Sequence, residues 1–189
     1  MLSVIVATRD SERPLVRTLA ALVPGATSGL ITEVLIADGG SRDDTPAVAD
    51  IAGCKLLAAD DERLRRRLRT AAAAARAPWL MFLQPGIVLD TPWIGEMRSF
   101  VERPVRDQQA AVFRRARCGH SALAEAAALV AAALGARPRP EQGLVIAADF
   151  YHQAGGHSQQ ARDPESELLR RIGGRRLARM STRAFRINT

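Results

Sequence analysis

The stretch EVLIADGGSRDDT, residues 33–45, contains the local pattern that decides the fold. Its apolar residues belong to the run at residues 31–37, which predicts a buried β-strand. The strand ends at Asp38, Gly39, Gly40 and Ser41, a turn whose glycines permit a ligand to approach the backbone closely. The acidic residues and the threonine at residues 43–45 can cap a following helix. A buried strand, a polar turn and a capped helix in this order form the unit from which α/β proteins are built.

The same alternation occurs on either side of this stretch. Apolar runs at residues 2–7, 55–58 and 79–83 predict three further strands, of which the run at 55–58 is weak. Helical patterns lie at residues 14–22 and 62–76, the first ended by Pro24 and Gly25 and the second by Pro78. Strands that alternate with helices predict βαβ units, so we expect an α/β protein with a parallel sheet.

The second half of the chain is less regular. Strands are predicted at residues 110–113, 144–147 and 178–187, and helices at residues 121–134 and 149–153. A further helix, capped by Asp163 or Ser166, is expected to run to Ile172, where two glycines end it. The chain contains no linker long enough to divide it, so we expect residues 1–189 to form a single domain.

The chain is strongly basic and rich in arginine. It has 189 residues, a formal net charge of +7 and a pI near 11.0, and Lys55 is the only lysine among 27 basic residues. Such a charge points to nucleic acid, an anionic membrane surface or a phosphorylated ligand. Nucleic acid is disfavoured because the 20 acidic residues are spread through the chain and no basic run is interleaved with aromatics for base stacking.

The sequence also predicts a location. It begins without the features of a signal peptide, and no segment reaches the apolar length of about 18–20 residues that spans a bilayer. Cys54 and Cys118 lie far apart and form no metal-binding spacing, which favours two reduced cysteines. We therefore expect a cytoplasmic protein, with peripheral contact to an anionic membrane left open.

Three polar segments follow predicted parallel strands. They are residues 8–11, 38–41 and 84–86, and ligands of such sheets bind beyond the carboxyl ends of the strands. Asp38 is placed to accept hydrogen bonds from a base or a sugar, although a turn of this kind also occurs without any ligand.

Two charged clusters each allow two interpretations. The arginines of residues 63–69 are either a solvated helix face or include one or two side chains, Arg66 or Arg69, that reach a diphosphate. The acidic residues at 163–167 serve either the dipole of a helix or general-base chemistry. The three histidines, His120, His152 and His157, are scattered and are expected at the surface or at helix caps.

Taken in order along the chain, several stretches resemble family 2 glycosyltransferases. They are LSVIVATRD at residues 2–10, EVLIADGGSRDDT at 33–45, the helix and strand at 71–83, and EQGLVI at 141–146 followed by Asp149-Phe150 and Gly155-Gly156. The last of these resembles a subgroup of small, single-domain bacterial members. The resemblance implies a GT-A fold, a Rossmann-type three-layer sandwich with a mainly parallel central sheet, and a nucleotide-sugar donor.

The resemblance also implies roles for individual residues. Asp38 falls on the aspartate that contacts the nucleotide base, beside Gly39 and Gly40, and Thr8, Arg9 and Asp10 fall on the segment that lines the nucleoside pocket. Glu165 falls near the acidic pair that supplies the catalytic base, with Asp163 as a nearby substitute. Glu141 and Gln142 fall in the acceptor-side motif.

One departure from the family pattern concerns its metal site. The family has two aspartates, separated by one residue, that hold Mg²⁺ or Mn²⁺; at this place the chain reads Gln84, Pro85 and Gly86. Hard divalent cations prefer carboxylate oxygens, so we assign no metal ligand here. Either arginines offset the charge of the diphosphate, the metal is held differently, or transfer activity is lost.

Three functions therefore remain open. The first is an inverting glycosyltransferase in which Glu165 or Asp163 activates an acceptor hydroxyl and Arg66 or Arg69 binds the diphosphate. The second is a catalytically inactive GT-A protein that binds a nucleotide or a protein partner. The third, motivated by the charge alone, is a basic adaptor for nucleic acid or membrane. The donor base, the sugar, the acceptor and the oligomeric state stay open.

Overall fold

The computed structural model of the chain describes residues 1–58, 63–103, 110–116 and 137–187. Its first half confirms the predicted alternation of strands and helices. The strands are β1 (Leu2–Thr8), β2 (Ile31–Asp38), β3 (Lys55–Ala58) and β4 (Trp79–Leu83), and the helices between them are α1 (Glu12–Thr27), α2 (Thr45–Ile51) and α3 (Leu64–Ala74). All four strands are parallel: β1 pairs with β2 and β4, and β3 pairs with β2.

The second half extends this sheet beyond β4. Its strands are β5 (Ile87–Leu89), β6 (Ala110–Ala116), β7 (Leu144–Ala147) and β8 (Leu177–Arg186), and the strand order is β3-β2-β1-β4-β7-β6-β8-β5. β7 is antiparallel to β4 and β6, whereas β6 and β8 are parallel. The helices are α4 (Trp93–Val101), α6 (Ala148–Gln153) and α7 (Pro164–Ile172), with 3-10 turns η1 (Pro140–Gln142) and η2 (Gly174–Arg176).

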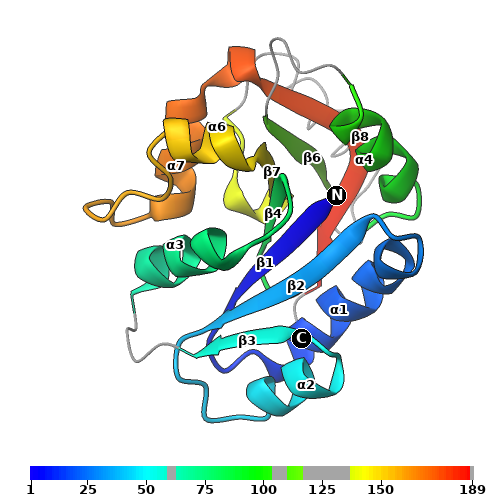
Figure 1. Cartoon of the computed structure of the whole chain (residues 1–189), viewed down its shortest axis with the longest axis vertical. Coiled ribbons are helices and arrows are strands. Elements are labelled where there is room, and N and C mark those ends of the chain that lie inside the picture. Colours follow the sequence, from blue (N-terminus) through cyan, green and yellow to red (C-terminus); the bar gives the residue numbers. More distant parts are fainter. Residues whose placement is uncertain (59–62, 104–109, 117–136, 188–189) are drawn as a thin grey trace.

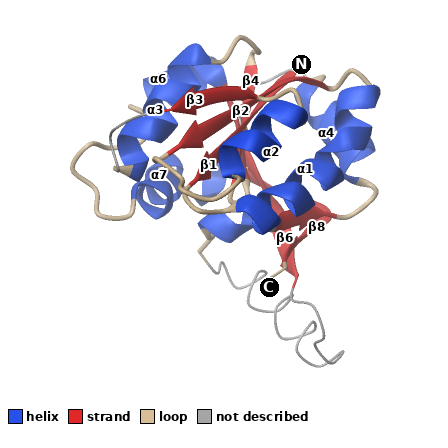
Figure 2. Cartoon of the chain, turned by 90° about the horizontal axis from the view of Figure 1, so that it is seen from below, coloured by secondary structure: helices blue, strands red, loops and turns tan. Residues whose placement is uncertain are grey.

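Helices cover both faces of the sheet, as Figures 1 and 2 show. Buried side chains from α1, α2 and α4 pack on one face, and those from α3, α6 and α7 pack on the other. The division follows from the alternation of side chains along a strand. Val4 of β1 packs with α1, α2 and α4, which form the first layer, and Ile5 packs with α3, α6 and α7, which form the second. The predicted three-layer α/β sandwich with a mainly parallel sheet is confirmed.

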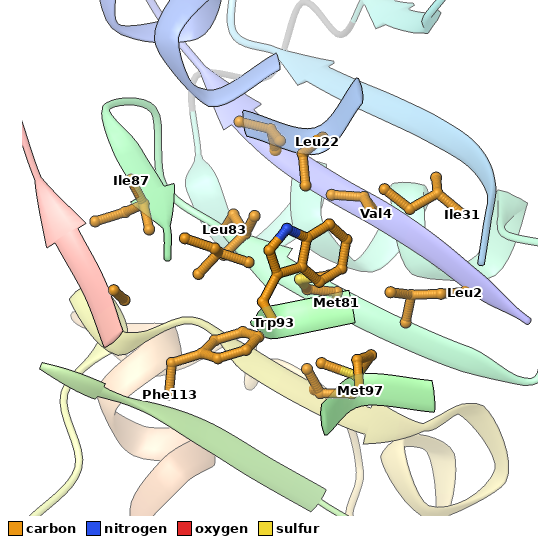
Figure 3. Packing of buried hydrophobic residues seen from close by; sticks show 14 of the residues in the cluster. Leu2, Val4, Leu22, Ile31, Met81, Leu83, Ile87, Trp93, Met97 and Phe113 are labelled. Carbon is orange, nitrogen blue, oxygen red and sulfur yellow. The ribbon is translucent and has the colours of Figure 1, made fainter. Parts of the chain in front are cut away.

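The first layer is centred on Trp93, whose indole lies among Val4, Leu22 and Met81 in Figure 3. A Cβ added to Gly25 of α1 would lie 2.4 Å from this ring, so α1 and α4 touch only because residue 25 has no side chain. The prediction that Pro24 and Gly25 end the first helix is wrong. Pro24 removes only one donor near the end of α1, and the helix continues to Thr27 before Gly29 turns the chain with a φ of 71°.

The second half of the chain contains the predicted strands, and also a strand and a helix that were not predicted. The predicted strands in the second half are present, but β5 and α4 were not predicted. The helix expected at residues 121–134 and the residues His120 and Cys118 lie outside the described residues, while Cys54 is a free, half-buried thiol. Among the described residues, no helix is both long enough and apolar enough to cross a membrane.

Candidate functional site

The polar segments predicted to converge do meet at one edge of the sheet. Thr8 is paired with Asp38 across β1 and β2, and Val6 is paired with Leu83 across β1 and β4. Gln84 follows Leu83 directly, so it leaves the sheet at nearly the same level as Thr8 and Asp38. This edge is the carboxyl end of β1, β2 and β4, the usual position of a ligand site in a parallel sheet.

Asp38 is buried, with 3% of its surface exposed, and its carboxylate accepts four hydrogen bonds from neighbouring residues. Oδ1 accepts from Thr8 Oγ1 at 2.8 Å and from Ser41 Oγ at 2.5 Å, and Oδ2 accepts from the amides of Gly40 at 3.0 Å and Ser41 at 2.8 Å. Burial alone would raise the pKa of Asp38, but these hydrogen bonds outweigh it and hold the pKa below its ordinary 3.8.

A carboxylate offers about four lone-pair positions, so the turn itself uses the accepting capacity of Asp38. The structure therefore gives this side chain a role in shaping the turn at Gly39 and Gly40. A contact between Asp38 and a nucleotide base stays a prediction.

A buried arginine supports the same turn from beneath. Arg67 of α3 is 6% exposed, and its Nη1 donates to the carbonyls of Thr8 at 2.6 Å and Ala37 at 2.9 Å. A Cβ on Gly39 would lie 2.7 Å from the guanidinium carbon of Arg67, so the glycine is required for this contact. Arg67 was not singled out from the sequence because it stands among five arginines. The signal that distinguishes it is its position on the same helical face as Leu64, Leu68 and Ala71.

The loop after β1 is tied to the loop after β2. Asp10 has a positive φ of 46°, its Oδ1 accepts from the amide of Arg42 at 2.7 Å, and its own amide donates to Ser41 Oγ at 2.8 Å. The amide of Ser11 donates to Thr45 Oγ1 at 2.8 Å. The side chains of Arg9 and Asp10 are exposed, so the two loops form one connected rim beside β1 and β2.

The structure also brings together two predicted residues that are 81 positions apart. Gln84 Nε2 donates to Glu165 Oε2 at 2.8 Å, which places the carboxyl of α7 at the end of β4. Both side chains are half-buried. Burial is the main cause that raises the pKa of Glu165 above its ordinary 4.5, and the nearby charge of Asp163 adds to it, while Gln84 and Arg186 act in the opposite direction. A raised pKa makes the ionised carboxylate a stronger base, as a proton acceptor in catalysis needs.

The other acidic and amide candidates have structural contacts. Asp163 is exposed and caps α7, accepting from the amide of Ser166 at 3.1 Å. Gln142 donates to the carbonyl of Phe113 at 2.7 Å and accepts from the amide of Arg139 at 2.9 Å, so it fixes the turn η1. Glu141 forms an ion pair with Arg115 at 3.1 Å and lies 3.9 Å from Arg186.

His152 is exposed as expected, whereas His157 is buried, and Arg69 contacts the loop after α6. Arg69 donates to the carbonyls of Gly155 at 3.4 Å and His157 at 3.3 Å, so it holds the loop after α6, and Arg66 is exposed on α3. His157 is not at the surface: it is 1% exposed, and Nδ1 lies 2.9 Å from the hydroxyl of Tyr151. Burial, together with the charges of Arg171 and Arg69, lowers the pKa of His157 to about 3, which keeps the ring neutral.

The residues at the end of β4 do not fit a divalent metal ion. The amide of Gln84 donates to Glu165 through its nitrogen, and its oxygen accepts from Arg186 Nη1 at 3.3 Å. The backbone carbonyl of Gly86 is already engaged, since it accepts a hydrogen bond from the amide of Ile187 at 3.0 Å. Within the described ranges, no three His, Cys, Asp or Glu side chains are grouped so that they could hold a metal ion.

A three-layer α/β sandwich with a polar site at the ends of β1, β2 and β4 is the architecture of many nucleotide-binding proteins. The sequence matches Glycosyl transferase family 2 over residues 3–134, and the chain belongs to this family.

Solved structures show that the fold is that of GT-A glycosyltransferases. Glucosyl-3-phosphoglycerate synthase from Mycobacterium tuberculosis, in complex with Mn²⁺, UDP and phosphoglyceric acid, matches with a TM-score of 0.72 and 17% identity over 100% of this chain and 71% of that chain. TarS from S. aureus matches with a TM-score of 0.74 and 10% identity over 98% of this chain and 60% of that chain.

A TPR repeat-containing protein from Synechococcus elongatus is 36% identical over 96 residues, which cover 48% of this chain and 23% of that protein. The chain thus spans about a quarter of the length of this curated relative.

Proposed function

We propose that the chain transfers a sugar from a nucleotide-sugar donor to a hydroxyl group of an acceptor, with inversion at the anomeric carbon. Membership of Glycosyl transferase family 2 supports this class of reaction. The observation that carries the proposal is the hydrogen bond of 2.8 Å between Gln84 and Glu165, which holds a carboxyl group with a raised pKa at the carboxyl end of the sheet.

The donor would lie along the connected rim formed by the loops after β1 and β2. Arg9 and Asp10, which are exposed, would line the nucleoside, whereas Thr8 is buried and donates to Asp38. The backbone at Gly40 would approach the nucleoside closely, because Gly40 is exposed. The synthase from Mycobacterium tuberculosis has been crystallised with UDP and with phosphoglyceric acid, which supports a nucleotide donor and a separate acceptor. Glu141 and Gln142 of η1 would face the acceptor side, with Arg115 beside Glu141.

The chemistry assigned to Glu165 is general-base catalysis. Its carboxylate takes the proton from the acceptor hydroxyl while that oxygen bonds to the anomeric carbon, and the bond from this carbon to the donor phosphate breaks. The electron pair of the broken bond leaves with the nucleoside diphosphate. Gln84 orients the carboxylate through Oε2, whereas Asp163 at the cap of α7 contributes its negative charge to the raised pKa of Glu165.

The first experiment is titration of the protein with UDP, GDP and their sugars by calorimetry, with and without Mn²⁺. We expect a nucleotide to bind. When acceptors are added, we expect the nucleoside diphosphate to be released as the sugar is transferred. Glu165→Gln should lower kcat by at least about a hundredfold with little change in donor affinity, because it removes the base but keeps a hydrogen-bonding partner for Gln84. If neither nucleotide binds under any condition, the proposal is wrong.

Glu167→Gln is the matched control on the same helix. Glu167 lies two residues from Glu165 and pairs with Arg171 at 2.6 Å and Arg170 at 3.7 Å. Its replacement should reduce stability without reducing kcat at a temperature where the protein is folded. Equal losses of kcat in both variants would show that Glu165 acts only through the structure.

A second candidate is a GT-A protein that binds a nucleotide or a partner without transfer. It is favoured by the neutral side chain of Gln84 at the place where the family has acidic metal ligands. It predicts nucleotide binding without transfer or donor hydrolysis, and Glu165→Gln would leave binding unchanged. Formation of a glycosylated product would exclude it. A single functional domain over residues 1–189, a cytoplasmic location and peripheral contact with an anionic membrane remain predictions.

A further inference from the structure

A guanidinium group contacts Gln84, the residue at the place where the family pattern has its acidic metal ligands. Arg186 is the last residue of β8, and its Nη1 lies 3.3 Å from Gln84 Oε1 and 3.9 Å from Glu141 Oε1. Its side chain is 49% exposed, so the charged end is accessible to a ligand at the edge of the sheet.

The backbone fixes this position. Ile87 of β5 is paired with Arg186, and the amide of Ile187 donates to the carbonyl of Gly86 at 3.0 Å. The residue that follows Arg186 is therefore hydrogen-bonded to the segment that follows β4. Arg186 arrives at this point because the last strand of the described sheet runs beside β5, although it is 102 residues away from Gln84 in sequence.

Two carboxyl groups lie near Arg186: Glu141 at 3.9 Å, and Glu165, whose raised pKa the charge of Arg186 counteracts. Glu141 approaches Arg115 more closely, at 3.1 Å, than it approaches Arg186, at 3.9 Å. The contact with Gln84 is to a neutral amide oxygen, which orients the guanidinium without neutralising it. A divalent cation at Gln84 would have to displace Arg186 from the amide oxygen of Gln84 and would gain only one neutral ligand. An anion at the same place would instead meet the positive charge of Arg186, which is already in position.

We propose that Arg186 binds the diphosphate of the donor and takes the place of the metal ion, so that the chain binds its nucleotide without a divalent cation. This inference rests on the proposed function, because it concerns the same donor site. Guanidinium groups bind phosphate oxygens with paired hydrogen bonds and keep their charge at any physiological pH. Arg186, and not Arg66 or Arg69, is therefore assigned to the diphosphate.

The test compares UDP with UMP, which lacks the second phosphate, by calorimetry in EDTA and in Mn²⁺; GDP and GMP replace them if the protein prefers guanine. The wild-type protein should bind the diphosphate in EDTA with a Kd within about twofold of its value in Mn²⁺. Arg186→Gln should weaken the diphosphate about tenfold and the monophosphate less than about threefold, because one charge-assisted contact of about 1.4 kcal/mol is lost. Arg186→Lys should restore part of the loss.

Arg170→Gln is the control for net charge. Its side chain lies 68% exposed on α7 and pairs only weakly with Glu167, at 3.7 Å. The Kd of this variant should stay within about twofold of wild type, and thermal unfolding should confirm that both glutamine variants are folded.

The outcomes separate this inference from the proposed function. Nucleotide binding that disappears in EDTA, or a folded Arg186→Gln variant that binds UDP like wild type, overturns the role of Arg186 while leaving a glycosyltransferase intact. Failure of the wild-type protein to bind UDP or GDP under either condition overturns the proposed function, and this inference with it.

Discussion

Replacement of Arg67 by methionine tests whether the buried guanidinium supports the turn at Gly39. Arg67→Met keeps most of the aliphatic volume of the side chain but removes the two hydrogen bonds of 2.6 and 2.9 Å to the carbonyls of Thr8 and Ala37. Hydrogen bonds to charged groups contribute about 1.5–3 kcal/mol each. The carbonyl of Thr8 still accepts from the amide of Gly39 at 2.9 Å, which limits its loss.

We therefore expect the free energy of unfolding to fall by about 2–3 kcal/mol, which corresponds to a Tm lower by about 4–12 °C for a chain of this length. Urea unfolding followed by circular dichroism measures this difference. Arg65→Met, two residues earlier on the same helix and more exposed, is the control and should change stability by less than about 0.5 kcal/mol. A loss below about 0.5 kcal/mol for Arg67→Met would refute the assignment.

Three further predictions concern carboxylates whose pKa is shifted. Asp38→Asn should lower the free energy of unfolding by roughly 2–4 kcal/mol, because the amide nitrogen faces donors from Thr8, Gly40 and Ser41. Since the pKa of Asp38 is lowered in the folded protein, the contribution of Asp38 to the stability of the wild type is present above pH 3.8 and is lost as the pH falls through the pKa of the folded state. Glu165 has a raised pKa, so its contribution to stability is present below pH 4.5 and is lost as the pH rises through the pKa of the folded state. When Tm is measured against pH, the Tm of Glu165→Gln should therefore rise relative to that of the wild type toward neutral pH. Glu96→Gln should lower the free energy of unfolding by about 2 kcal/mol, because one amide oxygen replaces a carboxylate that accepts four hydrogen bonds from Ser181 and Thr182; chemical unfolding at pH 7 measures it.

The sequence predicted the parallel half of the sheet because its signals are local. The run at residues 79–83 is apolar over its whole length, and the runs at residues 2–7 and 31–37 are mostly apolar, with Ser3, Thr32 and Glu33 as the polar exceptions, as expected for strands covered on both faces. The convergence of Thr8, Asp38 and Gln84 followed from topology alone, since parallel strands end at the same edge. The helix boundaries were less accurate: α1 runs past Pro24 and Gly25 to Thr27, and Gly25 is a point of close contact with Trp93 rather than the end of the helix.

The contacts that define the candidate site depend on long-range pairing, which no local pattern records. Arg67 could not be distinguished from its arginine neighbours without knowing that Gly39 lies above it. Gln84, Glu165 and Arg186 come from three separate elements, and only the register of β5 with β8 places the arginine beside the glutamine. His157 was assigned to the surface because an isolated histidine gives no sign of a partner such as Tyr151.

The position of β8 between β6 and β5 has a consequence for the order in which the protein can mature on the ribosome. Strands β1, β2 and β4 emerge first and can assemble the rim around Asp38, but the sheet beyond β7 is completed by a strand that is translated about ninety residues after β5. β5 pairs with β8, so this short strand stays without its partner until residues 177–186 have left the exit tunnel. A nascent chain halted before that point would hold the first loops of the site and lack Arg186.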